Sequence, residues 1–126
     1  DNVHKCQTTN SFGREAINFE QVLNYNPEII LVYEKEFYKK IYKDKKWQLI
    51  DAVKNKKVYF LPKGPFSWFD RPPSFMRLLG LKYIVSILHP DLYNMDVYEE
   101  SKKFYKLFLD LDLSDSQIDD ILGKNI

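Results

Sequence analysis

The stretch Asn26-Pro27-Glu28-Ile29-Ile30-Leu31-Val32-Tyr33 decides the fold of this chain. Asn26-Pro27 ends any helix that precedes it, because the residue before a proline avoids helical backbone angles. The short continuous apolar run that follows, residues 29–32, is typical of a strand buried on both faces of a parallel sheet. A second run of this kind, residues 58–61, ends at Pro62 and predicts a second buried strand.

Helical patterns before and between these two runs predict a layered α/β domain. Asn18 can cap a helix over residues 18–25, because its side-chain oxygen accepts hydrogen bonds from the amides of the first turn. Residues 35–43 and 47–55 are two further predicted helices. The alternation of helices and strands is typical of the α/β class, here with a small, mostly parallel sheet flanked by helices.

The second half of the chain is predicted to be helical. Pro72-Pro73 fits the first turn of a helix, where the missing amides are not needed. The helix over residues 74–88 is apolar on nearly all sides, which predicts that it is buried. A glycine inside a helix, here Gly80, lowers the stability of the helix by about 1 kcal/mol relative to alanine. A close approach by another element would explain why a glycine is present. Residues 96–109 have helical apolar spacing, and Ser114-Asp115-Ser116-Gln117 is a capping box that begins a last helix.

Length, composition and charge exclude several classes of protein. The chain has 126 residues, of which 44% are hydrophobic, which suits one domain with a real core. The 19 basic and 18 acidic residues nearly cancel, which argues against nucleic acid as a partner held by bulk charge. The single cysteine, Cys6, excludes an internal disulfide. Apolar stretches are too short to span a membrane. The chain opens at Asp1 without a signal-peptide pattern, so we expect a processed or trimmed sequence.

The motifs of enzymes and metal proteins are not found. The acidic stretch 110–115 lacks the glycine and the final glutamate of a calcium loop. His4 and Cys6 are too few for a metal site. His89 precedes a proline at a predicted helix end, where an imidazole suits the helix dipole structurally. Phosphate-binding loops, nucleophile elbows and cysteine–histidine pairs are missing, so we expect no enzyme, no metal and no cofactor.

The segment Lys63-Gly64-Pro65-Phe66-Ser67-Trp68-Phe69-Asp70-Arg71-Pro72-Pro73-Ser74 is the best candidate for a binding site. It follows the second predicted strand, and ligands of open α/β sheets bind beyond the carboxyl ends of strands. Its aromatic residues, its arginine and the helix start after it suit an anionic or aromatic ligand. The alternative is that Trp68 and Phe69 fold inward while Arg71 pairs with Asp70. Both interpretations remain open.

Four blocks of the sequence, in their order and spacing, carry a resemblance to a known family. They are Asn18-Phe-Glu-Gln-Val-Leu-Asn-Tyr-Asn-Pro-Glu-Ile-Ile-Leu-Val, Trp47-Gln-Leu-Ile-Asp-Ala-Val-Lys-Asn, Trp68-Phe-Asp-Arg-Pro-Pro-Ser with Arg77-Leu-Leu-Gly-Leu-Lys-Tyr, and His89-Pro-Asp-Leu-Tyr. Over residues 17–123 the chain resembles the C-terminal lobe of the helical-backbone substrate-binding proteins of ABC importers. Glu28, Lys56 and Tyr83 depart from the family's usual aspartate, glycine and tryptophan. The third block contains Arg71-Pro72-Pro73-Ser74, and in this form it resembles a subgroup of the family whose ligands include iron complexes and molybdate or tungstate.

The resemblance implies a larger, two-lobed protein. Such proteins hold their ligand in a cleft between two lobes that are joined by one long helix. Residues 1–126 would then be the C-terminal lobe, without the first lobe, the connecting helix and the first strand of the second lobe.

The resemblance also implies a function and roles for individual residues. Arg71, Trp68 and Phe66 would contact the ligand, with Tyr33 as a weaker candidate. Glu20 would meet the membrane permease, although a first-turn glutamate is equally favoured by the helix dipole. The protein would be the periplasmic or lipoprotein-anchored solute-binding component of an ABC importer, taking an anionic iron complex (siderophore or haem type) or an oxyanion.

Two other functions remain as alternatives. A lobe of a metal-cluster enzyme of related architecture should show cysteine or histidine ligands at the strand ends, and segment 63–74 has none. A plain protein-interaction domain would place Trp68 and Arg71 on a convex face.

Overall fold

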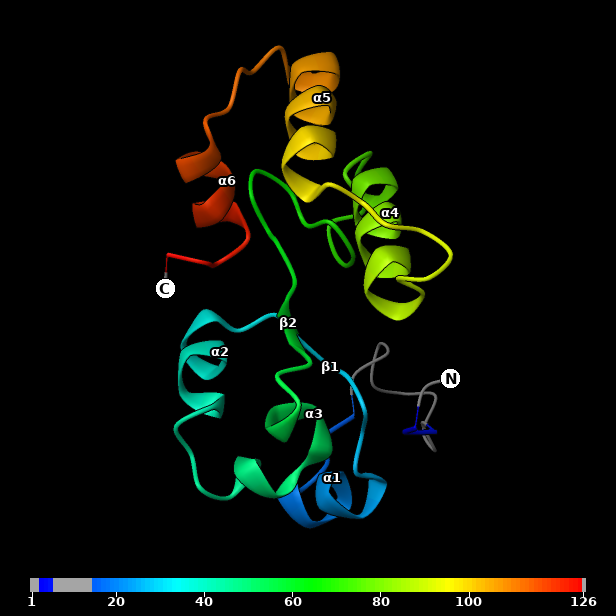
Figure 1. Ribbon diagram of the computed structural model, residues 1–126, viewed down its shortest axis with the longest axis vertical. Coiled ribbons are helices and arrows are strands. Elements are labelled where there is room, and N and C mark those ends of the chain that lie inside the picture. The colour runs from blue at the N-terminus through cyan, green and yellow to red at the C-terminus, as the bar shows by residue number, and fades with distance from the viewer. Residues whose placement is uncertain (1–2, 6–14, 126) are drawn as a thin grey trace. The chain divides into compact units, whose positions relative to one another are not determined.

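The computed structural model describes residues 3–5 and 15–125, and the chain divides into two compact units, residues 1–59 and 60–126 (Figure 1). Cys6 lies outside the described residues. The elements are, in chain order, α1 (Phe19–Tyr25), β1 (Ile30–Val32), α2 (Lys35–Ile41), the 3-10 helix η1 (Trp47–Leu49), α3 (Asp51–Lys54), β2 (Val58–Phe60), α4 (Arg77–Leu88), α5 (Val97–Leu109) and α6 (Asp115–Ile121). Among the described helices, none combines the length and the apolar character needed to cross a membrane.

A small parallel sheet and the helices around it form the first unit. β1 and β2 are hydrogen-bonded neighbours, as the two apolar runs predicted. Side chains from β1, α2, α3 with its cap residue, and β2 make the core of this unit, which consists of Val32, Ile41, Ile50, Ala52, Val53 and Val58. The predicted helix over residues 47–55 is divided into η1 and α3.

Asn26 ends one helix of the first unit and anchors the start of another. It lies after α1 with a positive φ of 37°, a conformation that asparagine tolerates better than most residues. Its side-chain oxygen accepts the amide of Asp51 at 3.0 Å, and its amide group donates to the Asp51 carboxylate at 2.7 Å. The hydrogen bond that the Asn26 side chain donates to the carboxylate has the largest effect on the pKa of Asp51 and lowers it, and the hydrogen bond from Lys54 lowers it further. Asn26, the residue predicted to end the first helix, therefore also fixes the start of α3.

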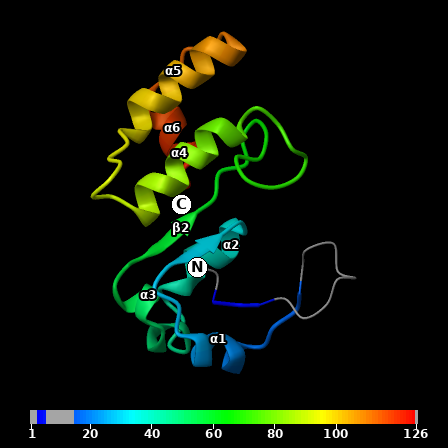
Figure 2. The ribbon, with the colours of Figure 1, turned by 90° about the vertical axis from the view of Figure 1, so that its right-hand side faces the viewer.

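Three helices and an irregular segment form the second unit. α4 lies beside α5 in both views (Figures 1 and 2), and the Lys82 ammonium pairs with the Glu100 carboxylate at 2.5 Å between them. α5 begins at its cap Asp96, and α6 begins with the predicted capping box. The core of this unit consists of Trp68, Met76, Leu79, Tyr105, Ile118 and Leu122.

The sequence predicted the start and the burial of α4 wrongly. The helix begins at Arg77, so Pro72-Pro73 does not occupy its first turn. Pro72 itself precedes a proline, which disfavours helical angles at that residue. The Ser74 hydroxyl accepts the amide of Met76 at 3.2 Å, an arrangement in which a serine side chain competes with helix formation. One face of α4 is also exposed, because the helix packs in this unit through its opposite face only.

Candidate functional site

The segment between β2 and α4 is irregular but firmly anchored. The amide of Trp68 donates to the carbonyl of Pro62 at 3.2 Å, and the Tyr105 hydroxyl of α5 donates to the carbonyl of Gly64. The buried Ser67 hydroxyl accepts the amides of two following residues, Phe69 at 3.3 Å and Asp70 at 2.9 Å. The backbone is thus fixed by local hydrogen bonds and by α5, so its outward side chains start from defined positions.

Trp68 is the anchor of this segment and is fully buried. Its ring lies edge-on to Tyr83 of α4, with centroids 5.7 Å apart at 90°, a favourable aromatic geometry. Of the two orientations that the sequence left open for Trp68, the structure shows the inward one. The physical reason is that a large indole stabilises the core more by burial than it would by remaining in water.

Phe66 and Arg71 lie on the outside of the same segment. Phe66 is 44% exposed and meets Phe75 edge-on, with ring centroids 6.1 Å apart. Arg71 is exposed. Since Phe75 stacks in turn on Phe108 of α5 at 5.5 Å, an aromatic surface extends from the segment to α5. Arg71 and Phe66 are thus both exposed side chains of one segment.

Tyr33 and Glu20, the other two predicted site residues, belong to the first unit. Tyr33 directly follows the last residue of β1, at the strand end where the sequence placed it, and it is partly buried. Glu20 is exposed in the first turn of α1. This position suits a contact with another protein and also suits the helix dipole.

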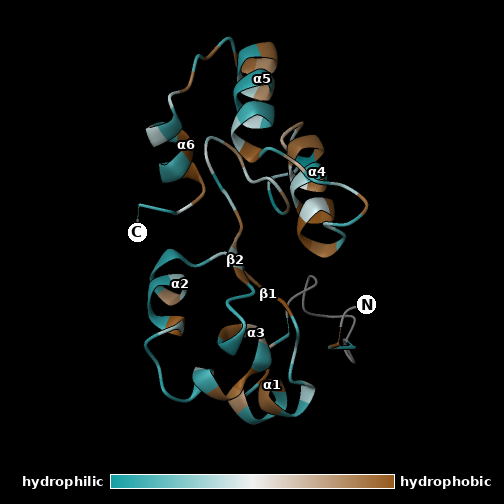
Figure 3. Cartoon of the chain, in the orientation of Figure 1, coloured by the Kyte–Doolittle hydropathy of each residue, from teal (hydrophilic) through white to brown (hydrophobic). Residues whose placement is uncertain are grey.

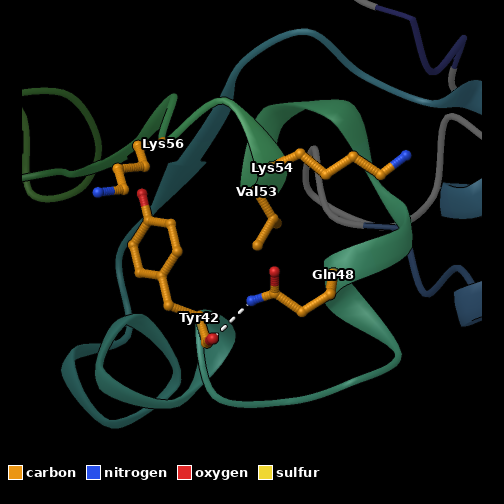
Figure 4. Close-up of a pocket in the computed structure, with 5 residues that line it drawn as sticks. All are labelled: Tyr42, Gln48, Val53, Lys54 and Lys56. Atoms are coloured by element: carbon orange, nitrogen blue, oxygen red, sulfur yellow. Dashed lines mark hydrogen bonds between the residues drawn. The ribbon is translucent and has the colours of Figure 1, made fainter.

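A shallow pocket of about 390 Å³ in the first unit was not predicted (Figure 4). Tyr42, Gln48, Val53, Lys54 and Lys56 line it, and the Tyr42 hydroxyl accepts the amide of Val58 of β2 at 3.3 Å. Burial raises the pKa of the Tyr42 phenol, so it stays protonated.

The two lysines of this pocket do not form an anion site. Their ammonium groups are directed away from each other in Figure 4, and that of Lys54 pairs with Asp51 at 3.3 Å. The five lining residues fall within residues 42–56 but follow no recognised binding motif, so the sequence did not indicate the pocket.

His4 is hydrogen-bonded through both ring nitrogens. Nδ1 lies 3.2 Å from the Tyr25 hydroxyl, and Nε2 lies 3.1 Å from the Glu15 carboxylate. Over residues 3–5 and 15–125, three or more histidine, cysteine or acidic side chains do not gather closely enough to hold a metal ion.

This chain is similar to known solute-binding proteins. A solved ABC transporter solute binding protein from Sulfurospirillum deleyianum is 44% identical, with a TM-score of 0.85 over 94% of this chain and 37% of that one. A periplasmic solute binding protein from Veillonella parvula is 29% identical, with a TM-score of 0.73 over 87% of this chain and 35% of that one. The molybdate-binding protein MolA of Haemophilus influenzae is 28% identical over 99 residues, which are 76% of this chain and 28% of MolA.

The chain thus spans between 28% and 37% of the length of each of these proteins, and its fold is part of a larger solute-binding fold. The sequence profile of the periplasmic binding proteins matches residues 2–65, about half of the chain. That match covers the first unit, including the strand and helix pattern around Asn26-Pro27, and the chain belongs to the periplasmic binding protein family.

Proposed function

We propose that residues 1–126 form the C-terminal lobe of the solute-binding component of an ABC importer. In this proposal the protein is not an enzyme: it captures a small anionic ligand outside the cytoplasm, in the periplasm or as a membrane-anchored lipoprotein, and delivers it to a permease. The similarity to the Sulfurospirillum protein over 94% of the chain supports the class of protein. One lobe provides part of a two-lobed cleft, so we expect the chain alone to bind weakly.

The observation that carries the proposal is the surface of segment 63–74, which directly follows β2. Ligands of open α/β sheets bind beyond the carboxyl ends of strands, and here the buried Trp68 holds a segment that presents Arg71 and Phe66 outward. A guanidinium group can donate two parallel hydrogen bonds to two oxygens of an anion. Tyr33, directly after β1, is a weaker second contact on the same reasoning.

We favour an oxyanion such as molybdate or tungstate as the ligand. The name of the Haemophilus relative and the planar donor set of Arg71 support this choice. An iron complex of siderophore or haem type is the second candidate, and the exposed edge-on pair of Phe66 and Phe75 favours it, because aromatic rings bind flat unsaturated ligands.

Arg71→Lys is the test of this proposal. The substitution keeps the charge but removes the planar pair of donors, so we expect ligand affinity to fall by about 2 kcal/mol, roughly 30-fold. The measurement is calorimetric titration of molybdate, tungstate, a ferric siderophore and haem into a two-lobed solute-binding protein that carries this chain.

Lys103→Ala is the matched control, because Lys103 is an exposed cation of α5 in the same unit. Its removal should leave affinity unchanged, whereas Arg71→Ala should be as damaging as Arg71→Lys. If Arg71→Lys binds every ligand of the panel as tightly as the parent protein, Arg71 lies outside the site. An exposed pair with Asp70 would account for that result, since such pairs contribute only about 0–1 kcal/mol.

Glu20→Ala should impair uptake in cells several-fold and leave ligand affinity unchanged, since a surface carboxylate that meets a permease contributes to docking. The control is Glu36→Ala, which removes a first-turn acid from α2 instead. If both variants import ligand normally and only lose about 0.5 kcal/mol of stability, Glu20 acts through the helix dipole and not at a permease.

A further inference from the structure

The C-terminal end of α2 and the turn after it carry a dense group of lysines. Residues 39–46 contain five lysines and a single acidic residue, Asp44. All five lysines are exposed, and the stretch between α2 and η1 is coloured as hydrophilic in Figure 3. The proposed ligand site and the predicted permease contact use none of them. We call this group the lysine cluster; it consists of Lys39, Lys40, Lys43, Lys45 and Lys46.

Backbone hydrogen bonds hold the lysine cluster in a compact turn. The amides of Lys43 and Asp44 donate to the carbonyl of Lys40 at 2.8 and 3.0 Å. The Asp44 carboxylate accepts the amide of Lys46 at 2.9 Å. The fold therefore fixes where these lysines leave the backbone and keeps their positive charges close together.

The chain neutralises little of the charge of the lysine cluster. Lys39 pairs with Glu36 at 3.3 Å. Within residues 3–5 and 15–125, no carboxylate lies in ion-pair distance of the other four lysines of the cluster. By contrast, Lys82, Lys102 and Lys106 of the second unit each pair with a carboxylate. The lysine cluster is therefore a local excess of positive charge.

The helix dipole explains only part of this arrangement. Lys39 and Lys40 lie in the last turn of α2, where the negative end of the dipole favours cations. Lys43, Lys45 and Lys46 lie beyond the end of the helix, outside the turn in which the dipole acts. The whole chain is nearly neutral, but surface charges act over a Debye length of only about 8 Å at physiological salt. A local cluster can therefore attract an anionic surface.

The chemistry of the lysine cluster fits the anionic headgroups of a lipid bilayer. All of its cations are lysines, and lysine is depleted from protein–protein interfaces, in which arginine is enriched. Bidentate recognition of a single anion also uses arginine, whereas a lysine ammonium is a hydrated point charge on a flexible stem. Groups of lysines are attracted to membranes by the summed charge of many headgroups, which requires no fixed geometry.

We propose that the lysine cluster contacts the anionic lipid headgroups of the membrane that holds the permease, and so keeps the first unit close to the bilayer. The periplasmic binding protein family, to which the chain belongs, implies a location outside the cytoplasm. This role rests on the proposed function for the presence of a membrane beside the protein, and it does not depend on the identity of the ligand or on Glu20.

Flotation of residues 1–126 with lipid vesicles tests this contact. The anionic vesicles contain phosphatidylcholine with about 30 mol% phosphatidylglycerol, and the neutral vesicles contain phosphatidylcholine alone. We expect the chain to bind the anionic vesicles and not the neutral ones, and we expect this binding to weaken at least about fivefold as the salt rises from about 50 to 300 mM. The double variant Lys43→Gln/Lys46→Gln should bind the anionic vesicles at least about tenfold more weakly.

Lys5→Gln/Lys103→Gln is the matched control, because it removes two exposed lysines outside the lysine cluster and changes the net charge equally. It should bind the anionic vesicles within about twofold of the parent chain. Circular dichroism checks that both variants fold. A measurement on the parent chain needs no variant: the anionic vesicles should slow acetylation of Lys43 and Lys46 at least about threefold and leave that of Lys103 unchanged.

Equal losses in the double variant and its control would overturn the proposal, and so would equal binding to the two kinds of vesicle. Displacement by inorganic phosphate at constant ionic strength would also contradict it, because the lysine cluster would then bind a free phosphate group. If the chain fails to bind anionic vesicles at low salt, the cluster is a solvated surface or a contact for an acidic protein. The titration of Arg71→Lys uses no vesicles, so failure of the ligand site and failure of the lipid contact can be distinguished.

Discussion

Trp68→Ala should lower the free energy of unfolding by about 3–5 kcal/mol. The indole is fully buried and belongs to the second core, together with Leu79 of α4 and Tyr105 of α5. Its removal takes a large apolar group out of the core and leaves a cavity that the anchored segment cannot easily close. Urea unfolding followed by far-ultraviolet circular dichroism measures the loss without depending on tryptophan fluorescence.

Phe66→Ala is the matched control for Trp68. It removes an aromatic ring from the same segment, but this ring is 44% exposed and meets Phe75 edge-on. We expect Phe66→Ala to lower the free energy of unfolding by less than about 1 kcal/mol, as most surface substitutions do. Equal losses for the two variants would contradict the division of this segment into a buried anchor and an outward surface.

Gly80→Ala should lower the free energy of unfolding by about 3 kcal/mol, although alanine is the better helix former. A Cβ atom at this position would lie 2.8 Å from the carbonyl carbon of Trp68 and closer still to its carbonyl oxygen. Because these are backbone atoms of an anchored segment, neither the helix nor the segment can move aside cheaply. Chemical denaturation measures the effect, and a loss of soluble protein on expression is the expected outcome if the remaining stability is small.

Gly64→Ala is the control, since a Cβ atom at Gly64 would meet no atom within 4 Å. This variant should be as stable as the parent within about 0.5 kcal/mol. An unchanged stability of Gly80→Ala would contradict the close approach of α4 to the backbone of Trp68.

The sequence alone determined the elements whose signals are local. Asn26-Pro27 and the apolar run after it predicted the end of α1 and the position of β1, because proline restricts the backbone whatever its surroundings. The caps Asn18, Asp96 and Ser114 accept amides of their own first turns, so the starts of α1, α5 and α6 could be predicted from a few neighbouring residues.

The sequence also indicated part of the candidate site. The composition of segment 63–74 predicted an irregular stretch after the second strand, with Arg71 and Phe66 available at the surface. The orientation of Trp68 could not be predicted in this way. Whether an aromatic ring faces inward depends on Tyr83 and Tyr105, which follow 15 and 37 residues later in the chain.

Only the tertiary structure decided which surfaces are paired. The sequence showed a glycine in α4 and an apolar pattern on all sides of this helix, and predicted a close neighbour and complete burial. The structure identifies the neighbour of Gly80 as the backbone of Trp68, and leaves Leu78 and Leu81 exposed. The apolar character of a side chain determines how strongly it favours burial over contact with water. Which residue covers that side chain depends on packing between parts of the fold that are distant in the sequence, and a local sequence pattern does not contain this information.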